Sequence, residues 1–473
     1  MTRLCAFLGV AAVFCVRSAF ALSVTFFGGA GQVGGSCARV DGGGVSVLVD
    51  CGTAYSDEAG GSREMAETGF GFAVTNLTAV LITHAHQDHA GRVPELVRAG
   101  FRGPIVMTEP TRILLAAAWK SQLKYDKTIS AKPKWSRRHQ AVLDDLMSLV
   151  KVVPFDEELS FGGMKAVFRP VKHLPGSASI RFQDDEGSCI FSGDLGTYRS
   201  RLVKSIDPAV KSDAVFVETT YGAASHGTPE EIEAEYARFR QAVAQTVRSG
   251  GLAWIPAFAM DRSQRVLLEI ERGIADGDIP SPAPIYFLSP SARAMTDAYC
   301  KNPHWFDGVD MKGLARLLKR SRKYFVPSKG WGDGGAILIT TSGMMDAAAS
   351  AELLPDLAPR ADVHVFLVGY QSPGTSGHAL ANGAKELVLH DEKGDRKAEV
   401  RCVTDRFGCF SGHGDACEND RWLVNNLASD IYLVHGDKAA LTARKADLEK
   451  RCKRPVTIVR KGETYRIVHG TDR

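Results

Sequence analysis

The sequence predicts an α/β protein built from two sheet-and-helix units. From Leu22 to Tyr221, short apolar runs alternate with glycine-rich turns and a few helical stretches, a pattern typical of a sheet covered by helices. From Thr228 a long helix is followed by apolar runs that alternate with further helices, which predicts a second unit with a parallel sheet. After Arg401 the chain returns to short strand-and-loop segments.

The expected strands of the first unit are short apolar runs bounded by turn residues. They are Ser23–Phe27, Val45–Val49, Ala79–Thr83, Lys165–Pro170, Ser188–Phe191 and Ala214–Val217. In the second unit, Pro229–Val247 is expected to form a long helix, because acidic residues in its first turn suit the helix dipole. The strands expected after it are Leu252–Pro256, Pro284–Leu288, Ala336–Thr340 and Val363–Val368.

Composition narrows the function only slightly. The net charge of +4 is small for 473 residues, so any site for a polyanion must come from local charge. The ten cysteines form no CxxC pair, which is typical of reduced thiols rather than of a disulfide framework.

Residues 1–21 resemble a leader, with a basic start, the apolar run Leu4–Cys15 and a small-residue segment Ala19–Ala21. Arg17 interrupts the approach to a cleavage site, so a signal peptide and a misassigned start codon stay equally open. Without a signal peptide we expect a cytoplasmic protein. No later apolar run reaches the roughly 18–20 residues of a membrane span.

The strongest chemical signal is the segment His84-Ala85-His86-Gln87-Asp88-His89, directly after an expected strand. Four possible metal ligands within six residues are not explained by core packing. Imidazole and carboxylate groups suit borderline cations such as zinc. Alternation can direct His84 and His86 to one ion, while Asp88 and His89 turn to a second.

Other acidic and histidine residues also follow apolar runs, where ligand sites of α/β sheets gather. They are Asp50, His173, Asp194, Glu218 and His435. Each alone is better explained as a capping aspartate or a loop histidine. Together with the histidine-rich segment they predict one site.

These residues resemble the metallo-β-lactamase superfamily, whose HxHxDH motif matches residues 84–89. Further segments are similar to the β-CASP family of nucleases, over about residues 23–440. They are Glu218–Gly222 (ETTYG), Ile255–Arg262 (IPAFAMDR), Thr341–Met344 (TSGM), Gly369–Thr375 (GYQSPGT), Phe410–His413 (FSGH) and Leu433–Asp437 (LVHGD).

The resemblance implies a metallo-β-lactamase αββα sandwich with an inserted α/β β-CASP domain. Residues 22–222 would form the first part of the lactamase domain, 223–410 the β-CASP domain and 411–473 the return to the lactamase domain. Residues 1–21 would be the leader.

The resemblance also implies a role for each motif residue. One zinc ion (Zn²⁺) would be bound by His84, His86 and His173, and a second by Asp88, His89 and His435. Asp194 would bridge both ions, and Asp50 would orient their ligands. His413 would act as general acid, oriented by Glu218. Substrate contacts are expected from Arg262, Ser342, Gly343, His378 and Ser411.

The implied activity is that of a zinc-dependent ribonuclease that uses a hydroxide shared by two zinc ions. It would be an endonuclease, and an additional 5′–3′ exonuclease activity is compatible with the resemblance. RNA is favoured over DNA because His435 keeps a ligand that the DNA-processing branch typically replaces. A small-molecule metallo-hydrolase and a non-catalytic RNA-binding subunit are the alternatives. The inserted domain argues against the first, and the filled ligand positions argue against the second. A homodimer is compatible with these features.

Gly29–Gly34 fits the GxGxxG pattern of dinucleotide-binding proteins. That reading requires a helix after the glycines, whereas Ser36–Val49 is typical of a hairpin, so we expect no nucleotide cofactor. The glycines are expected to form a tight turn at the edge of the metal cleft.

Two basic stretches are candidates for an RNA path, with a solvated helix face as the alternative. The first holds Lys120, Lys124, Lys127, Lys132, Lys134, Arg137 and Arg138 among Trp119, Tyr125 and Trp135. The second holds Arg316, Lys319, Arg320, Arg322 and Lys323. Three positions depart from the β-CASP pattern: Asp261 replaces Gly, Gly412 replaces Ala, and His378 replaces the Arg of many members.

Overall fold

The computed structural model describes residues 22–54, 69–130, 134–197, 200, 202, 207–306, 308–331, 334–391 and 394–469. The leader-like segment, residues 1–21, lies outside this part. Among the described residues, no helix is both long enough and apolar enough to cross a bilayer.

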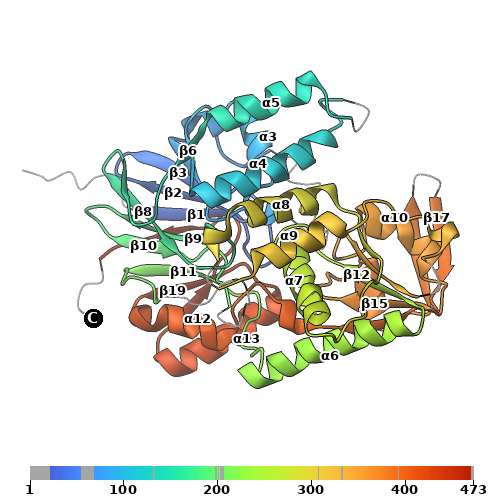
Figure 1. The fold of residues 1–473 in the computed structure, drawn as a ribbon. Helices are drawn as coiled ribbons and strands as arrows, with labels where there is room; N and C mark the ends of the chain where they lie inside the picture. The colour runs from blue at the N-terminus through green and yellow to red at the C-terminus, as the bar shows by residue number, and fades with distance from the viewer. Residues whose placement is uncertain are drawn as a thin grey trace, which may run out of the picture.

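Two seven-stranded sheets form the first unit (Figure 1). The first sheet has the order β21 (Thr464–Arg466), β1 (Ser23–Gly28), β2 (Cys37–Gly42), β3 (Val45–Val49), β4 (Ala79–Leu81), β5 (Ile105–Met107) and β6 (Val150–Val152). The second has the order β20 (Val456–Ile458), β19 (Asp430–Val434), β11 (Ala214–Glu218), β10 (Ser188–Phe191), β9 (Ala178–Gln183), β8 (Met164–Pro170) and β7 (Glu158–Phe161).

The two sheets pack face to face over one apolar core. Phe26 of the first sheet meets Phe216 of the second with their ring centroids 5.3 Å apart. On β11, Phe216 points into this core, while Val215 and Val217 face the other way, toward Trp422. This period-two alternation explains why every residue of β11 is buried, since both faces of the strand are covered.

Helices cover the outer face of each sheet. The first sheet is covered by α3 (Val93–Arg98), α4 (Glu109–Lys124) and α5 (Arg137–Ser148), and the second by α12 (Ala416–Leu423) and α13 (Lys438–Cys452). The layers are therefore helix, sheet, sheet and helix, and the expected αββα sandwich is confirmed.

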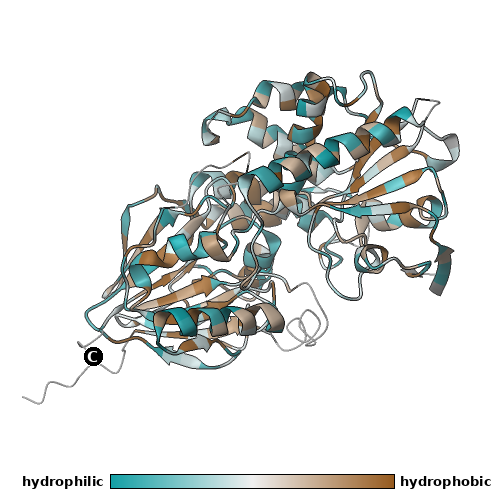
Figure 2. Ribbon diagram, turned by 90° about the horizontal axis from the view of Figure 1, so that it is seen from below, coloured by the Kyte–Doolittle hydropathy of each residue, from teal (hydrophilic) through white to brown (hydrophobic). Residues whose placement is uncertain are grey.

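The second unit is built on a five-stranded parallel sheet, as expected. Its order is β13 (Ile285–Phe287), β14 (Ala336–Thr340), β12 (Leu252–Pro256), β15 (Val363–Leu367) and β18 (Val403–Arg406). Its helices are α6 (Pro229–Arg248), α7 (Arg262–Ala275), α8 (Pro290–Lys301), α9 (Met311–Arg320), α10 (Ala348–Leu357) and α11 (Ser376–Ala381). Figure 2 shows hydrophobic strands inside each unit and helices of mixed character outside them.

Helix α6 begins where the sequence predicts, because Thr228 and Glu231 form a reciprocal capping box at its N-terminus. The antiparallel hairpin of β16 (Glu386–Asp391) and β17 (Gly394–Glu399) was not expected.

The chain leaves the first unit after β11 and returns to it before α12, which covers the second sheet. Strand β19 pairs in parallel with β11, and β21 pairs with β1, so the last segment completes both lactamase sheets. The carboxyl ends of the parallel strands β10, β11 and β19 therefore lie side by side at one edge. This edge faces the second unit, and it is where the expected ligands gather.

Candidate active site

The histidine-rich segment spans the loop after β4 and the start of α2 (Gln87–Ala90), and it contributes His84 and His86 to the first cluster of possible metal ligands. His86 Nδ1 lies 3.2 Å from His84 Nε2 and 3.1 Å from His173 Nε2. The distance from His84 Nε2 to Asp194 Oδ2 is 3.4 Å. These separations are close to the roughly 3.3 Å edge of a tetrahedron around an ion bound at about 2.0–2.1 Å.

A second cluster combines Asp88, His89, Asp194 and His435. His89 Nε2 lies 3.1 Å from Asp194 Oδ1, and His435 Nε2 lies 3.2 Å from Asp88 Oδ2. Asp194 thus presents one carboxylate oxygen to each cluster. The structure brings together all seven side chains that the sequence assigned to metal binding.

The electrostatics of the clusters fit divalent cations. Asp194 is 1% exposed, and both of its carboxylate oxygens lack a hydrogen-bond partner, as does Asp88 Oδ1. Burying carboxylate oxygens without hydrogen-bond donors costs free energy, and a bound cation would offset this cost. Nitrogen and oxygen donors in these numbers suit zinc and similar ions.

Hydrogen bonds on the far side of the imidazole rings fix their orientation. His89 donates from Nδ1 to Asp50 Oδ2 over 2.7 Å, and Thr83 holds the same carboxylate through its backbone N–H and hydroxyl, each at 2.8 Å. His173 donates from Nδ1 to the carbonyl oxygen of Gly412 over 2.8 Å. Such contacts leave Nε2 of each ring as the free acceptor, which a metal ligand needs.

The pKa values of the histidines differ between the clusters. Burial lowers the pKa of His84 and His173, and it lowers the pKa of His86 to about 3, so these rings are neutral. Burial also opposes a charge on His89, but the carboxylates of Asp194 and Asp50 outweigh it and raise the pKa of His89 well above its ordinary value. Cation binding in the second cluster therefore releases protons.

His413 lies beside the clusters but belongs to neither. Its Nδ1 donates to Glu218 Oε1 over 3.2 Å, and the backbone N–H groups of Leu195 and Thr220 donate to the same carboxylate at 3.2 and 2.9 Å. Its ring centroid lies 4.6 Å from that of His173. With Nδ1 engaged and its side chain 17% exposed, His413 can present Nε2 to a bound ligand.

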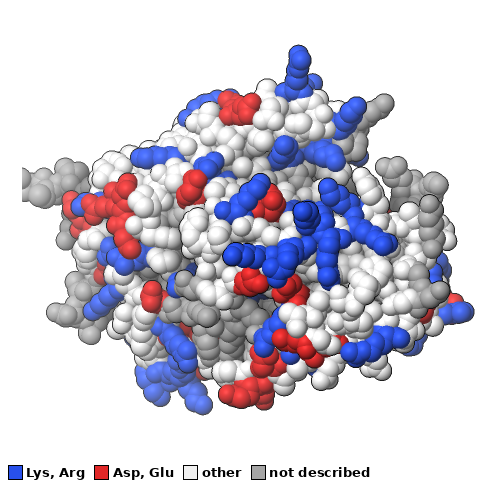
Figure 3. Space-filling view, in the orientation of Figure 1, with Lys and Arg blue, Asp and Glu red and all other residues white. Residues whose placement is uncertain are grey.

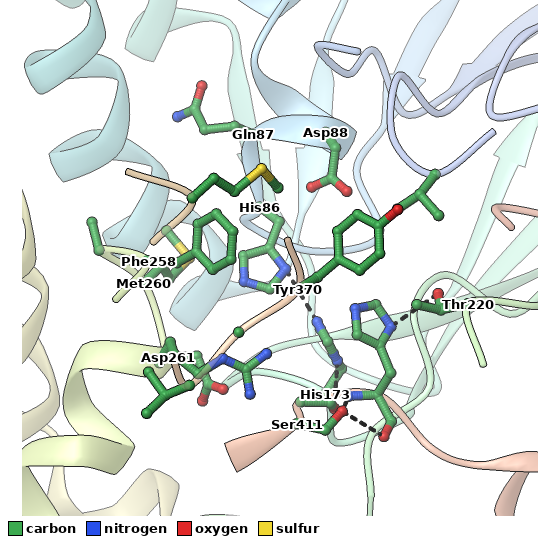
Figure 4. Close-up of a pocket in the computed structure, with 18 of the residues that line it drawn as sticks. His86, Gln87, Asp88, His173, Thr220, Phe258, Met260, Asp261, Tyr370 and Ser411 are labelled. Carbon is green, nitrogen blue, oxygen red and sulfur yellow. Dashed lines mark hydrogen bonds between the residues drawn. The ribbon is translucent and has the colours of Figure 1, made fainter. Parts of the chain in front are cut away.

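A cavity of about 900 Å³ opens over the clusters and separates the two units. His86, Asp88 and Thr220 line it from the first unit, and Phe258 and Tyr370 line it from the second (Figure 4). This volume is in the range of ligand-binding clefts.

Two of the expected substrate-binding residues, Arg262 and Ser411, line this cavity. The Arg262 guanidinium is buried, which lowers its pKa, and its Nε and Nη1 atoms lack hydrogen-bond partners. Ser411 is held in the loop before His413, whose backbone N–H donates to the Ser411 hydroxyl over 3.2 Å.

The other three expected contacts do not line the cavity in the described structure. The Ser342 hydroxyl donates to Asp346 over 2.6 Å, and the Gly343 carbonyl oxygen accepts from Gln371. His378 lies on α11 and contacts Asn382 of the following turn.

The sequence did not single out Thr220, whose hydroxyl oxygen lies 3.2 Å from His435 Nδ1 and 3.4 Å from His413 Nδ1. It connects the second cluster with the expected general acid. The only available signal was its place in the ETTYG segment, directly after Glu218 and Thr219.

The glycine-rich segment after β1 lies at the edge of the site, as expected. The backbone N–H of His435 donates to the Gly29 carbonyl oxygen over 2.8 Å, and Gly29 has a φ of +68°. The expected hairpin is confirmed, because β2 pairs antiparallel with β3.

The expectation that Trp119 is available to nucleic acid was wrong. Its side chain is fully buried under α4, and the indole N–H donates to the Ala90 carbonyl oxygen over 3.1 Å. Tyr125, at the end of the same helix, is 63% exposed and lines the cavity.

The chain matches three protein families in succession. Residues 30–243 match the metallo-beta-lactamase superfamily, residues 263–380 the Beta-Casp domain, and residues 397–459 the Zn-dependent metallo-hydrolase RNA specificity domain.

Two curated relatives align with about nine tenths of the chain. Transcription termination factor FttA of Methanocaldococcus jannaschii is 30% identical over 450 residues, which cover 90% of this chain and 68% of FttA. Ribonuclease TTHA0252 of Thermus thermophilus is 29% identical over 428 residues, which cover 88% of this chain and 94% of the ribonuclease.

A solved structure from Enterococcus faecalis V583, of unknown function, agrees in fold with a TM-score of 0.51. It covers 94% of this chain and 99% of its own, but at 11% identity it bears on the fold alone. Taken with the αββα sandwich, the inserted parallel sheet and the shared histidine and aspartate clusters, these matches show that the chain belongs to the β-CASP family of the metallo-β-lactamase superfamily.

Proposed function

We propose that this protein is a zinc-dependent ribonuclease that hydrolyses phosphodiester bonds within RNA, and that it can also degrade RNA from the 5′ end. The observation that supports this most is the shared carboxylate of Asp194 between two ligand clusters, beside the His413–Glu218 pair. The relatives named as a ribonuclease and a transcription termination factor, and the RNA specificity domain, favour RNA as the substrate.

Each cluster would hold one zinc ion, the first through His84, His86 and His173 and the second through Asp88, His89 and His435, with Asp194 shared. When bound, the pair would supply Lewis-acid stabilisation and an activated water nucleophile. Asp50 holds the His89 ring so that Nε2 faces the cluster.

The remaining groups act on the phosphodiester itself. Arg262 lines the cavity with unpartnered nitrogens and would hold phosphate oxygens through charge-assisted hydrogen bonds. His413, in its protonated form, would donate the Nε2 proton to the leaving 3′ oxygen, while Glu218 keeps Nδ1 protonated and the ring in place.

A basic surface supports a path for RNA outside the cavity. Figure 3 shows Lys and Arg side chains gathered over α8 and α9. Lys319, Arg320 and Lys323 are exposed, and Tyr324 directly after them is 84% exposed. Lys and Arg side chains that neutralise the phosphates of a nucleic acid, beside an exposed aromatic ring, are typical of single-strand binding.

Removing these charges is expected to weaken RNA binding and its salt dependence. In the triple variant Lys319→Gln, Arg320→Gln, Lys323→Gln, the slope of log K against log[salt] should fall by about 2, since each phosphate contact on a single strand contributes roughly 0.7. Fluorescence anisotropy with a single-stranded RNA at several salt concentrations measures this. The matched control neutralises Lys151, Lys165 and Arg169 on the lactamase sheets, and equal slopes in the two triple variants would remove the α9 surface from the path.

The proposed function is tested with purified protein and end-labelled RNA, with and without a chelator. We expect cleavage to stop when the metal is removed and to return with added zinc, at two ions per chain by elemental analysis. Product lengths separate internal cuts from 5′–3′ degradation. Turnover of a thioester or lactam, with intact RNA, would instead support the small-molecule hydrolase.

A further inference from the structure

Asp261 stands out on the cavity wall because its backbone is in an uncommon conformation. It precedes α7 with a φ of +65° and a ψ of −55°, a region that residues other than glycine rarely occupy. The side chain is only 3% exposed, yet it lines the cavity. A buried acid held in such a conformation points to a role for its side chain.

One carboxylate oxygen of Asp261 is engaged and the other is not. Oδ2 accepts from Arg265 Nε, whereas Oδ1 is buried without a hydrogen-bond partner. Buried acceptors are nearly always satisfied, so this oxygen needs a donor that the described residues do not supply. Its negative charge excludes a phosphate oxygen as the partner and selects a hydroxyl or an N–H group.

The Asp261 carboxylate lies near the first cluster. A Cβ atom placed on Gly412 would lie 3.4 Å from Asp261 Oδ2, the oxygen that Arg265 engages, and 3.2 Å from His173 Cε1, so the carboxylate and a metal-cluster histidine flank Gly412. Figure 4 shows Asp261 below Phe258 and Met260, with His173 and Ser411 to its right. Arg265, its ion-pair partner, also donates from Nη1 to the Ser411 carbonyl oxygen over 3.4 Å.

Arg262, the next residue, supplies the complementary chemistry. Its Nε and Nη1 atoms are buried donors without partners, and the residue lines the same cavity. Arg262 thus offers donors without partners, and Asp261 offers an acceptor without a partner. Together they match a substrate in which a phosphate lies next to a hydroxyl group. The sugar–phosphate backbone of RNA offers this pair through the ribose 2′-hydroxyl, and that of DNA offers no such donor.

We propose that Asp261 accepts a hydrogen bond from the 2′-hydroxyl of a ribose that flanks the scissile phosphate, and that this contact makes the site selective for RNA over DNA. The proposal rests on the ribonuclease function given above. Asp261 would then contact the substrate in addition to forming its ion pair with Arg265.

The test compares an RNA oligonucleotide with versions that carry a single 2′-deoxy nucleotide on the 5′ or the 3′ side of the mapped cut. In the native protein, one of the two deoxy substrates should lose about 10- to 100-fold in kcat/KM, because it leaves a buried acceptor unpaired. In Asp261→Gly, which suits the positive φ, the same comparison should differ by less than about 3-fold.

Asp261→Asn is the second variant, because asparagine has nearly the same shape as aspartate and its neutral amide is a weaker acceptor. Its deoxy penalty should also fall, and circular dichroism checks that both variants fold despite the change beside Arg265. An unchanged penalty in both variants would overturn the proposal, since a merely structural role would lower the activity on both substrates alike.

A binding measurement distinguishes failure of this proposal from failure of the proposed ribonuclease function. The dissociation constants of an all-ribose oligonucleotide and an all-2′-deoxyribose oligonucleotide of the same sequence are measured by anisotropy with zinc-loaded His413→Ala protein, with and without Asp261→Gly. Absence of cleavage by the native protein would refute the ribonuclease function, while the ribo-to-deoxy affinity ratio would still decide the role of Asp261. A ribo-to-deoxy affinity ratio that Asp261→Gly leaves unchanged would count against the proposed contact of Asp261.

Discussion

Asp194→Asn is expected to remove metal binding from both clusters at once and to lower kcat/KM for RNA by on the order of 10³-fold or more. Its two oxygens face His84 Nε2 at 3.4 Å and His89 Nε2 at 3.1 Å, so an amide would point N–H donors at one cluster and present only an uncharged oxygen to the other. Loss of groups that only orient ligands costs roughly 10–100-fold, and loss of a shared ligand should exceed that. Elemental analysis after dialysis and a cleavage assay measure the two effects.

Asp50→Asn is the matched control, because Asp50 contacts His89 Nδ1 and Thr83 rather than a cluster centre. It should weaken metal affinity by about 10–100-fold, and excess zinc should restore most of the activity. Excess zinc should not rescue Asp194→Asn. Full activity and two bound ions in Asp194→Asn would refute the shared-ligand arrangement.

The clusters could be predicted from sequence because each ligand follows a recognisable apolar strand. Parallel strands bring their carboxyl ends to one edge, so His435 could be placed beside Asp194 although 241 residues separate them in the chain. The strand expected at Ala79–Thr83 ends at Leu81, since Thr83 uses its backbone N–H and hydroxyl to hold Asp50 rather than to extend the sheet.

Exposure of individual side chains was harder to predict. Trp119 lies in a basic stretch, but Leu115 one turn earlier and Leu123 one turn later are buried with it, so this stripe of α4 faces the core. The composition of a stretch does not show which face of a helix is covered. By composition alone, the buried Trp119 could not be distinguished from the exposed Tyr125. The helical spacing of the neighbouring leucines was the signal that could have separated them.

Residues whose role depends on the second unit were the least predictable. Ser342 and Gly343 match a family motif, yet their hydrogen bonds join them to Asp346 and Gln371 outside the cavity lining. Which oxygen of Asp261 has a hydrogen-bond partner depends on where Arg265 and Gly412 lie in space. Neither neighbour relation follows from the period of a helix or a strand.

His413→Ala is expected to lower kcat for RNA by about 10²- to 10⁴-fold, the range of a lost general acid, while metal content and RNA affinity stay unchanged. The reason is geometric, because His413 lies in neither ligand cluster and contacts Glu218 through Nδ1 at 3.2 Å. Glu218→Gln should give a smaller loss, since the amide can still hold the ring but no longer stabilises the imidazolium. Single-turnover cleavage with saturating zinc-loaded enzyme isolates the chemical step.

A substrate with sulfur in place of the leaving 3′ oxygen distinguishes proton donation from positioning. A thiol has a pKa near 8.5, so a thiolate departs without a proton that an alkoxide requires. The native protein and His413→Ala should therefore cleave the sulfur substrate at rates within about 10-fold of each other. A His413→Ala defect that is equally large on both substrates would show that the ring positions the phosphate, and the leaving oxygen would then have to take its proton from another donor in the cavity.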